Sequence, residues 1–135
     1  MSEFFTEVLI VDDDPSVLFL HKIIIKDGKL HPSPKAFSDP ELALEHVITK
    51  DISNQRLLIF LDINMPKMNG WELLAKMESI VKHADIKVIM VTSSLDKQDR
   101  ERAHSNQLVI DFWEKPLDDP SIAELKGKLG NWISF

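Results

Sequence analysis

The chain has 135 residues, a formal net charge of −6, a hydrophobic content of 44% and no cysteine. This length predicts one domain with a sizeable core, and the lack of cysteine excludes disulfides and thiolate metal sites. The acidic balance argues against binding to nucleic acid. No apolar run approaches the about 20 residues of a membrane span, and residues 1–5 lack the features of a signal peptide. We therefore expect a cytoplasmic protein with no membrane partner.

Residues 8–11 form an apolar run that predicts a short first strand. Asp14 then suits the N-cap of a helix, and Pro15 suits its first position, where the missing N–H costs nothing. The same Asp-Pro pair recurs at residues 39–40 and 119–120, each time ahead of apolar residues at helical spacing. The sequence therefore predicts three helices with similar starts.

Residues 31–37 hold two prolines, which cannot donate to a sheet ladder, so any strand here lies at an edge. Residues 58–61 are apolar without interruption and run into Asp62, as expected for a strand that is buried on both faces. Residues 71–81 carry apolar side chains at helical spacing and predict a helix. Residues 87–91 are a further apolar run, which predicts another central strand.

Residues 96–106 predict an unusual helix, because Ala103 is their only apolar residue. A helix that is polar all round docks weakly, so we expect marginal stability here and a position that small energies can bias. Residues 108–113 predict the fifth strand. Five alternations of strand and helix indicate an α/β fold with a parallel sheet. With residues 31–37 at one edge, they match a flavodoxin-like, doubly wound (βα)5 arrangement with five strands in the order 2-1-3-4-5.

The carboxyl ends of parallel strands meet at one edge of the sheet. The sequence places Asp12 and Asp13 after the first strand, Asp62 after the third, Thr92 after the fourth and Lys115 after the fifth. Each residue alone has an ordinary explanation as a turn, cap or surface residue. Reactive polar groups at four of the five strand ends are hard to ascribe to chance, so we interpret them as one functional site.

The predicted cluster of acids has a chemical consequence. Two carboxylates about 4 Å apart repel each other by roughly 4 kcal/mol at an effective dielectric near 20, so the cluster needs a cation or a raised pKa. Mg²⁺ binds few carboxylates and completes its octahedron with water and phosphate oxygens. The arrangement favours phosphoryl chemistry, in which a carboxylate acts as the nucleophile and forms an aspartyl-phosphate. Lys115 and the metal would stabilise the charge on the phosphoryl oxygens.

Four motifs carry these residues, in this order: VLIVDDD at 8–14, LDINMP at 61–66 with Met68 and Gly70, VTS at 91–93, and EKP at 114–116. Together they resemble the response regulator receiver domain of two-component signalling, of the stand-alone, CheY-like type. The resemblance covers nearly the whole chain. It implies a single receiver domain over residues 1–135 with no output domain, which signals by contact with a downstream protein.

The resemblance also implies roles for the acidic residues. Asp62 would be the phosphoacceptor, which takes a phosphoryl group from a histidine kinase or a histidine phosphotransfer protein. Asp13, Asp62 and the backbone carbonyl of Asn64 would bind Mg²⁺, for which Mn²⁺ can substitute, and Asp12 would act through water. The chain would phosphorylate and dephosphorylate only its own Asp62 and would not be a turnover enzyme.

Further roles follow from the same resemblance. Lys115 would pair with the phosphoryl oxygens, and its peptide bond to Pro116 would be cis. Thr92 would move toward the phosphoryl group, and Phe112 stands where an aromatic side chain turns inward in the active state. Phe112 lacks the hydroxyl group of a tyrosine, so a hydrogen bond from that group is absent. The fourth helix, fifth strand and fifth helix would form the switched interaction surface of a monomer or weak dimer.

Two other classes of function stay open. A receiver-like module could dock proteins without phosphorylation, although the complete set of acids disfavours it. A phosphatase or mutase that resembles the haloacid dehalogenase family needs a second acid two residues after the nucleophile, where Asn64 stands. The five histidines show no metal-ligand spacing, and we expect His21 and His46 to be solvated or to lie at the rim.

Overall fold

The computed structural model describes residues 3–133 and has one parallel sheet. Its strands are β1 (Phe5–Val11), β2 (Lys35–Phe37), β3 (Gln55–Asp62), β4 (Asp85–Thr92) and β5 (Val109–Glu114). They lie in the order β2-β1-β3-β4-β5, and all four neighbouring pairs are parallel. The predicted fold and strand order are therefore confirmed. The edge strand β2 has only three residues, in keeping with the two prolines just before it.

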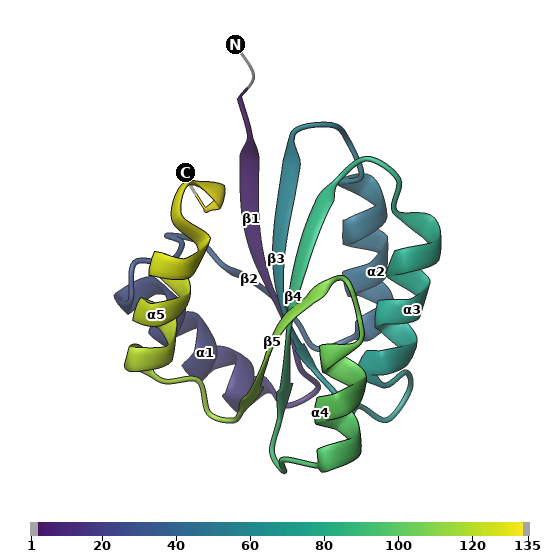
Figure 1. The fold of residues 1–135 in the computed structure, drawn as a ribbon, viewed down its shortest axis with the longest axis vertical. Coiled ribbons are helices and arrows are strands. Elements are labelled where there is room, and N and C mark those ends of the chain that lie inside the picture. Colours follow the sequence, from purple (N-terminus) through teal and green to yellow (C-terminus); the bar gives the residue numbers. More distant parts are fainter. Residues whose placement is uncertain (1–2, 134–135) are drawn as a thin grey trace.

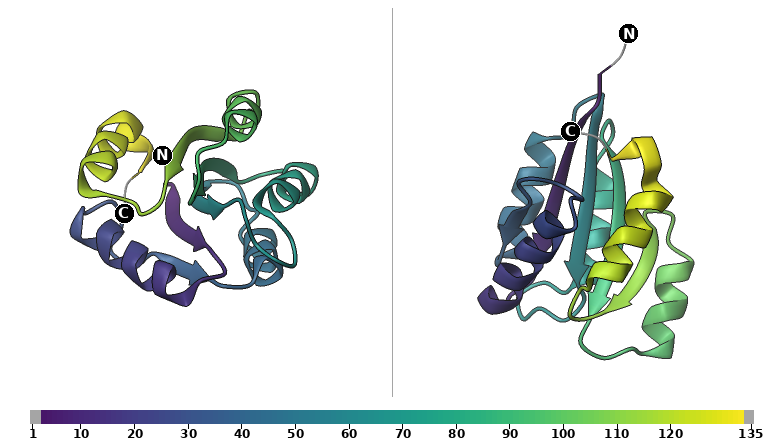
Figure 2. Two further views of the ribbon diagram at one scale, coloured as in Figure 1. Left: turned by 90° about the horizontal axis from the view of Figure 1, so that it is seen from below. Right: turned by 90° about the vertical axis from the view of Figure 1, so that its left-hand side faces the viewer.

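Helices cover both faces of the sheet (Figures 1 and 2). They are α1 (Pro15–Asp27), α2 (Pro40–Thr49), α3 (Gly70–Ile80), α4 (Lys97–His104) and α5 (Asp119–Leu129), followed by the short helix η1 (Gly130–Trp132). Helices α1 and α5 lie on one face, while α2, α3 and α4 lie on the other. Each face has its own apolar core, and β3 contributes alternate residues to both. Among the described residues, no helix has the length and apolar character needed to cross a bilayer.

The three expected helix starts are present, one of them shifted by a residue. Asp14 and Asp39 are N-caps whose carboxylates accept a backbone N–H two residues ahead. In α5 the N-cap is Asp118, which accepts from the N–H of Ser121 at 2.7 Å, and Asp119 is already helical. The prediction of Asp119 as the cap was wrong because two adjacent acids can both cap a helix, and Pro120 fits the second helical position as well as the first.

Helix α4 is attached differently from its neighbours. Ala103 is its only buried residue, as the polar sequence predicted. The helix is nevertheless held to α3 by polar groups, since Trp71 donates its indole N–H to Asp99 at 3.0 Å. The guanidinium carbon of Arg102 lies 4.7 Å from the centre of the Trp71 ring. Docking of α4 thus combines the burial of Ala103 with a hydrogen bond and a cation–π contact to α3.

Candidate functional site

Three carboxylates meet at the carboxyl edge of the sheet. Strand β1 pairs with β3 so that Val11 lies beside Leu61, which brings Asp12 next to Asp62. Ligand oxygens of Asp12, Asp13 and Asp62 all lie within 4.8 Å of one another. Asp12 and Asp62 are 2% and 3% exposed, and Asp13 is exposed. The parallel sheet therefore produces the acid cluster that the sequence predicted.

Lys115, the residue directly after β5 (Val109–Glu114), reaches into this cluster. Its backbone N–H donates to the carbonyl of Thr92 at 2.7 Å, which fixes the end of β5 against β4. Its Nζ atom donates to Asp12 Oδ2 at 2.8 Å and lies 3.3 Å from Asp62 Oδ1. The peptide bond between Lys115 and Pro116 is cis. The ammonium group thus bridges two of the three carboxylates.

Burial and these contacts shift the pKa values of Asp62 and Lys115. Burial, together with the charge of Asp12, raises the pKa of Asp62 to about 6, although Lys115 opposes the shift. Burial alone would lower the pKa of Lys115, but its bond to Asp12 and the charge of Asp62 raise it above the usual value. A buried carboxylate with an elevated pKa beside a lysine ammonium group is a typical functional-site feature.

The groups line a cavity of about 430 Å³ at the edge of the sheet. Six of the predicted site residues share it: Asp12, Asp13, Asp62, Asn64, Lys115 and Pro116. The backbone N–H of Asn64 donates to Asp62 Oδ1 at 3.3 Å. Carboxylate and carbonyl oxygens are the ligands that Mg²⁺ prefers, so the donor set fits this ion.

Thr92 and Phe112 are placed differently from the rest. Thr92 is fully buried, and its hydroxyl group donates to the carbonyl of Ser94 at 3.0 Å and accepts the N–H of Ser94 at 3.2 Å. Phe112 is half-buried on β5 and lines grooves on the outer side of that strand. In this structure, neither side chain is among the residues that line the acid cavity.

The turn after β3 leaves no room for a side chain at Gly70. The N–H of Gly70 donates to the carbonyl of Ile63 at 2.8 Å, which folds the loop back on the strand. A Cβ atom at Gly70 would collide with the backbone carbonyl of Asp62. Asn69 and Glu72 then form a capping box at the start of α3. The glycine in the sequence motif is therefore a steric requirement of the loop that holds Asp62.

His21 is a cavity residue that the sequence interpretation missed. The sequence predicts a histidine that is solvated or lies at the rim, and His21 does line the acid cavity from α1, but it is 2% exposed and not solvated. The available signal was its spacing, because His21 lies three residues after Leu18 and four before Ile25, both buried. Burial lowers the pKa of His21 to about 4, with Asp12 opposing the shift and Lys115 adding to it.

Comparison with known proteins identifies the family of this chain. A model of the response regulator receiver domain family matches residues 8–125. The chain belongs to this family. Receiver domains are phosphoacceptor switches of two-component signalling that interact with histidine kinases or phosphotransfer proteins and bind Mg²⁺ at an acidic pocket. In this receiver domain, Asp12, Asp13 and Asp62 form an acidic cluster whose ligand oxygens are close enough together to hold a metal ion.

Solved receiver structures share the fold over almost the whole chain. A two-component response regulator from Cytophaga hutchinsonii is 27% identical, with a TM-score of 0.83, and the match covers 96% of this chain and 99% of that one. A response regulator receiver protein from Dyadobacter fermentans is 26% identical, with a TM-score of 0.76, over 92% and 97% of the two chains.

A curated relative is longer. The cyclic di-GMP phosphodiesterase response regulator RpfG of Xanthomonas campestris is 32% identical over 128 residues, which are 95% of this chain and 32% of that protein. The chain therefore spans about a third of the length of this relative. The phosphodiesterase activity in that name is a property of the longer protein.

Proposed function

We propose that the protein accepts a phosphoryl group on Asp62 from a phosphohistidine of a histidine kinase or histidine phosphotransfer protein. The observation that carries this proposal is the position of Asp62, whose carboxylate lies within 4.8 Å of two other acids and 3.3 Å from the Lys115 ammonium group. In the transfer, an Asp62 oxygen forms a bond to phosphorus while the phosphorus–nitrogen bond of the donor breaks. The electron pair leaves with the imidazole nitrogen.

Only the ionised form of Asp62 is a nucleophile. Lys115 favours that form through its charge, and the same ammonium group lies where it can pair with the oxygens of an incoming phosphoryl group. Lys115 would therefore both favour the nucleophilic form of Asp62 and stabilise the phosphorylated product. The fully buried Thr92, at the end of the adjacent strand, would contribute its hydroxyl group to the phosphoryl oxygens after leaving its bond to Ser94.

Asp13, Asp62 and the carbonyl of Asn64 would hold Mg²⁺, or Mn²⁺ in its place. When bound, the ion neutralises charge on the phosphoryl oxygens. Asp12 is suited to act through water, because its oxygens are already engaged. Its Oδ1 accepts the N–H of Asp14 at 2.9 Å, and its Oδ2 accepts from Lys115 at 2.8 Å.

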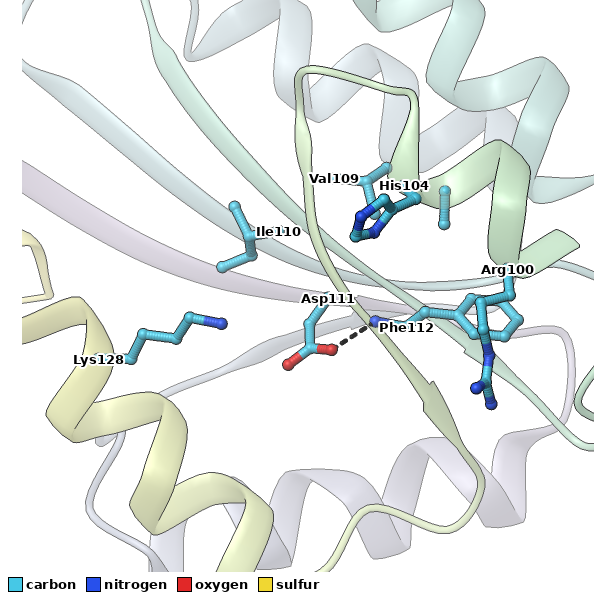
Figure 3. Close-up of a pocket in the computed structure, with 8 residues that line it drawn as sticks. Arg100, His104, Val109, Ile110, Asp111, Phe112 and Lys128 are labelled. Carbon is cyan, nitrogen blue, oxygen red and sulfur yellow. Dashed lines mark hydrogen bonds between the residues drawn. The ribbon is translucent and has the colours of Figure 1, made fainter.

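The output surface would be formed by α4, β5 and α5. A groove of about 540 Å³ runs between these elements and is lined by Arg100, Ala103, His104, Val109, Ile110, Asp111, Phe112 and Lys128 (Figure 3). Within it, the carboxylate of Asp111 accepts the backbone N–H of Phe112 at 2.8 Å. A shift of α4 and of the Phe112 ring would alter this groove, and a downstream protein would detect the change.

Incubation with Mg²⁺ and a small acyl-phosphate donor, followed by intact-mass measurement, tests the proposal. We expect one added phosphoryl group in the wild type, and none in Asp62→Asn or after chelation of the metal. No mass gain in the wild type, or a gain that survives Asp62→Asn, would contradict it. Continuous phosphate release from a generic phosphoester would instead favour a phosphatase, and unchanged partner affinity in Asp62→Asn would favour a phosphorylation-independent docking module.

A further inference from the structure

His21 connects α1 to the loop that carries Lys115. Its Nε2 atom accepts the backbone N–H of Leu117 at 3.3 Å. Leu117 lies two residues after Lys115, beyond the cis bond to Pro116. His21 and Leu117 are both 2% exposed, so the hydrogen bond is shielded from water. The loop between β5 and α5 is thus attached to α1 through a residue that lines the acid cavity.

The bond requires a neutral imidazole ring. A nitrogen that accepts an N–H cannot carry a proton, so the proton of the ring is on Nδ1. The low pKa of His21, which burial causes, keeps the ring in this form at neutral pH. A charged ring would lose the acceptor for Leu117 and would add a second cation beside Lys115.

We propose that His21 is a positioning residue for Lys115. By holding Leu117, it fixes the loop on the far side of Pro116, while the bond from Lys115 N–H to Thr92 fixes the near side. Lys115 is therefore anchored at both ends, and its ammonium group is held between Asp12 and Asp62. This role rests on the proposed phosphoacceptor function, since positioning matters only if Lys115 acts on a phosphoryl group.

Small displacements of a group that stabilises transferred charge have large effects on rate, up to about a hundredfold for about 1 Å. Replacing His21 with leucine would leave the buried N–H of Leu117 without its acceptor. The loop would then move to find another partner. Lys115 would lose its fixed distance to Asp62, while the carboxylates that bind the metal would keep theirs.

The chain offers a matched pair of variants. His21→Leu removes the acceptor, and His21→Gln restores an acceptor oxygen near the position of Nε2. His31→Leu is the control, because His31 is also buried and also bonded to backbone, with Nδ1 accepting from Ser33 at 3.0 Å and Nε2 3.1 Å from Thr6 O. Thr6 lies near the amino end of β1, far from the acid cavity at the other end.

Three quantities are measured for each variant: the rate of phosphorylation by a small acyl-phosphate at saturating Mg²⁺, Mg²⁺ affinity by calorimetry, and the NMR shifts of the Leu117 amide and the Lys115 Nζ group. We expect His21→Leu to slow phosphorylation by about tenfold with little change in Mg²⁺ affinity, and to shift both NMR signals. His21→Gln should recover most of the rate. His31→Leu should lower thermal stability but should change neither the phosphorylation rate nor the NMR signals of Leu117 and Lys115.

A wild-type rate in folded His21→Leu, or an equal loss in His31→Leu, would overturn the positioning role. If the wild-type protein itself is not phosphorylated, the proposed function fails. The NMR shifts of Lys115 in His21→Leu would still decide whether His21 fixes that side chain, because they require no phosphoryl transfer.

Discussion

The indole N–H of Trp71 donates to the carboxylate of Asp99 at 3.0 Å and joins the first turn of α3 to α4. Trp71 directly follows Gly70, whose N–H closes the loop after Asp62. The ring of Trp71 also lies under the guanidinium group of Arg102. Helix α4 is therefore tied to the loop that follows Asp62 by one aromatic side chain.

Trp71→Phe should loosen α4. The phenyl ring keeps a face for Arg102, but the hydrogen bond to Asp99 is lost at a cost of about 1 kcal/mol. We expect faster hydrogen exchange in the peptide that covers Lys97–His104. The control is Trp132→Phe, because Trp132 also donates to an acid, Asp85 at 2.8 Å, and also faces a cation, Lys87. Equal exchange changes in α4 in both variants would contradict the proposed tie.

Asp62 should make the metal-free protein less stable as the pH rises. Its pKa in the folded protein is about 6, against 3.8 in the unfolded chain. Between these values the folded state binds more protons, so the free energy of unfolding falls with rising pH. Asp62→Asn should remove this slope and be more stable than the wild type above pH 6 by about 1 to 3 kcal/mol. Urea unfolding in chelator, from acidic to neutral pH, measures the difference.

His21 should act in the opposite direction in the same pH range. Its pKa falls from 6.5 to about 4 on folding, so the unfolded chain binds the proton first and stability declines as the pH falls through this window. The slope from Asp62 must therefore be obtained as a difference between wild type and Asp62→Asn. Saturating Mg²⁺ should abolish that difference in slope, because a bound cation favours the carboxylate.

Gly70→Ala should destabilise the protein by about 1 to 3 kcal/mol and reduce phosphorylation of Asp62. The added methyl group would meet the carbonyl of Asp62 itself. Gly127→Ala is the matched control, since Gly127 lies in α5 and a Cβ atom there meets nothing within 4 Å. Gly127→Ala should be more stable than the wild type by roughly 0.5 to 1 kcal/mol, because alanine favours helices. Thermal unfolding and intact-mass measurement test both variants.

Asp51 should contribute to stability without affecting the site. Its carboxylate accepts three consecutive backbone N–H groups, those of residues 82–84, at 2.7 to 2.9 Å. Asp51→Ala should cost about 1 kcal/mol and leave phosphorylation unchanged. Asp27→Ala, an exposed acid at the end of α1, should cost nothing. Burial alone would raise the pKa of Asp51, but the three hydrogen bonds lower it below the usual 3.8. The contribution of Asp51 to the free energy of unfolding is therefore present at neutral pH and is lost as the pH falls below 3.8.

The sequence predicted the sheet and the acid cluster because both follow from local patterns. Uninterrupted apolar runs identify central strands, and parallel pairing then brings Asp12 and Asp62 together without further information. Prolines near β2 identified the edge strand in the same way.

Contacts between distant segments were not accessible from such patterns. The spacing of His21 indicated a buried position, but its hydrogen bond joins it to the backbone of Leu117, 96 residues away. Likewise, α4 is hydrogen-bonded to a tryptophan in another helix. The polar character of residues 96–106 correctly predicted a helix with little apolar burial. It gave no indication that hydrogen bonds would replace that burial, because the partner residues carry no sequence signal of their own.

The bond between Asp111 and the N–H of Phe112 has a consequence for recognition. Strand β5 lies at the edge of the sheet opposite β2, and edge strands invite pairing with the backbone of another chain. Here a side chain already occupies one donor of that strand. Strand addition at this point would first have to displace the carboxylate. A partner that binds the groove shown in Figure 3 would thus rely more on side-chain contacts than on backbone pairing with β5.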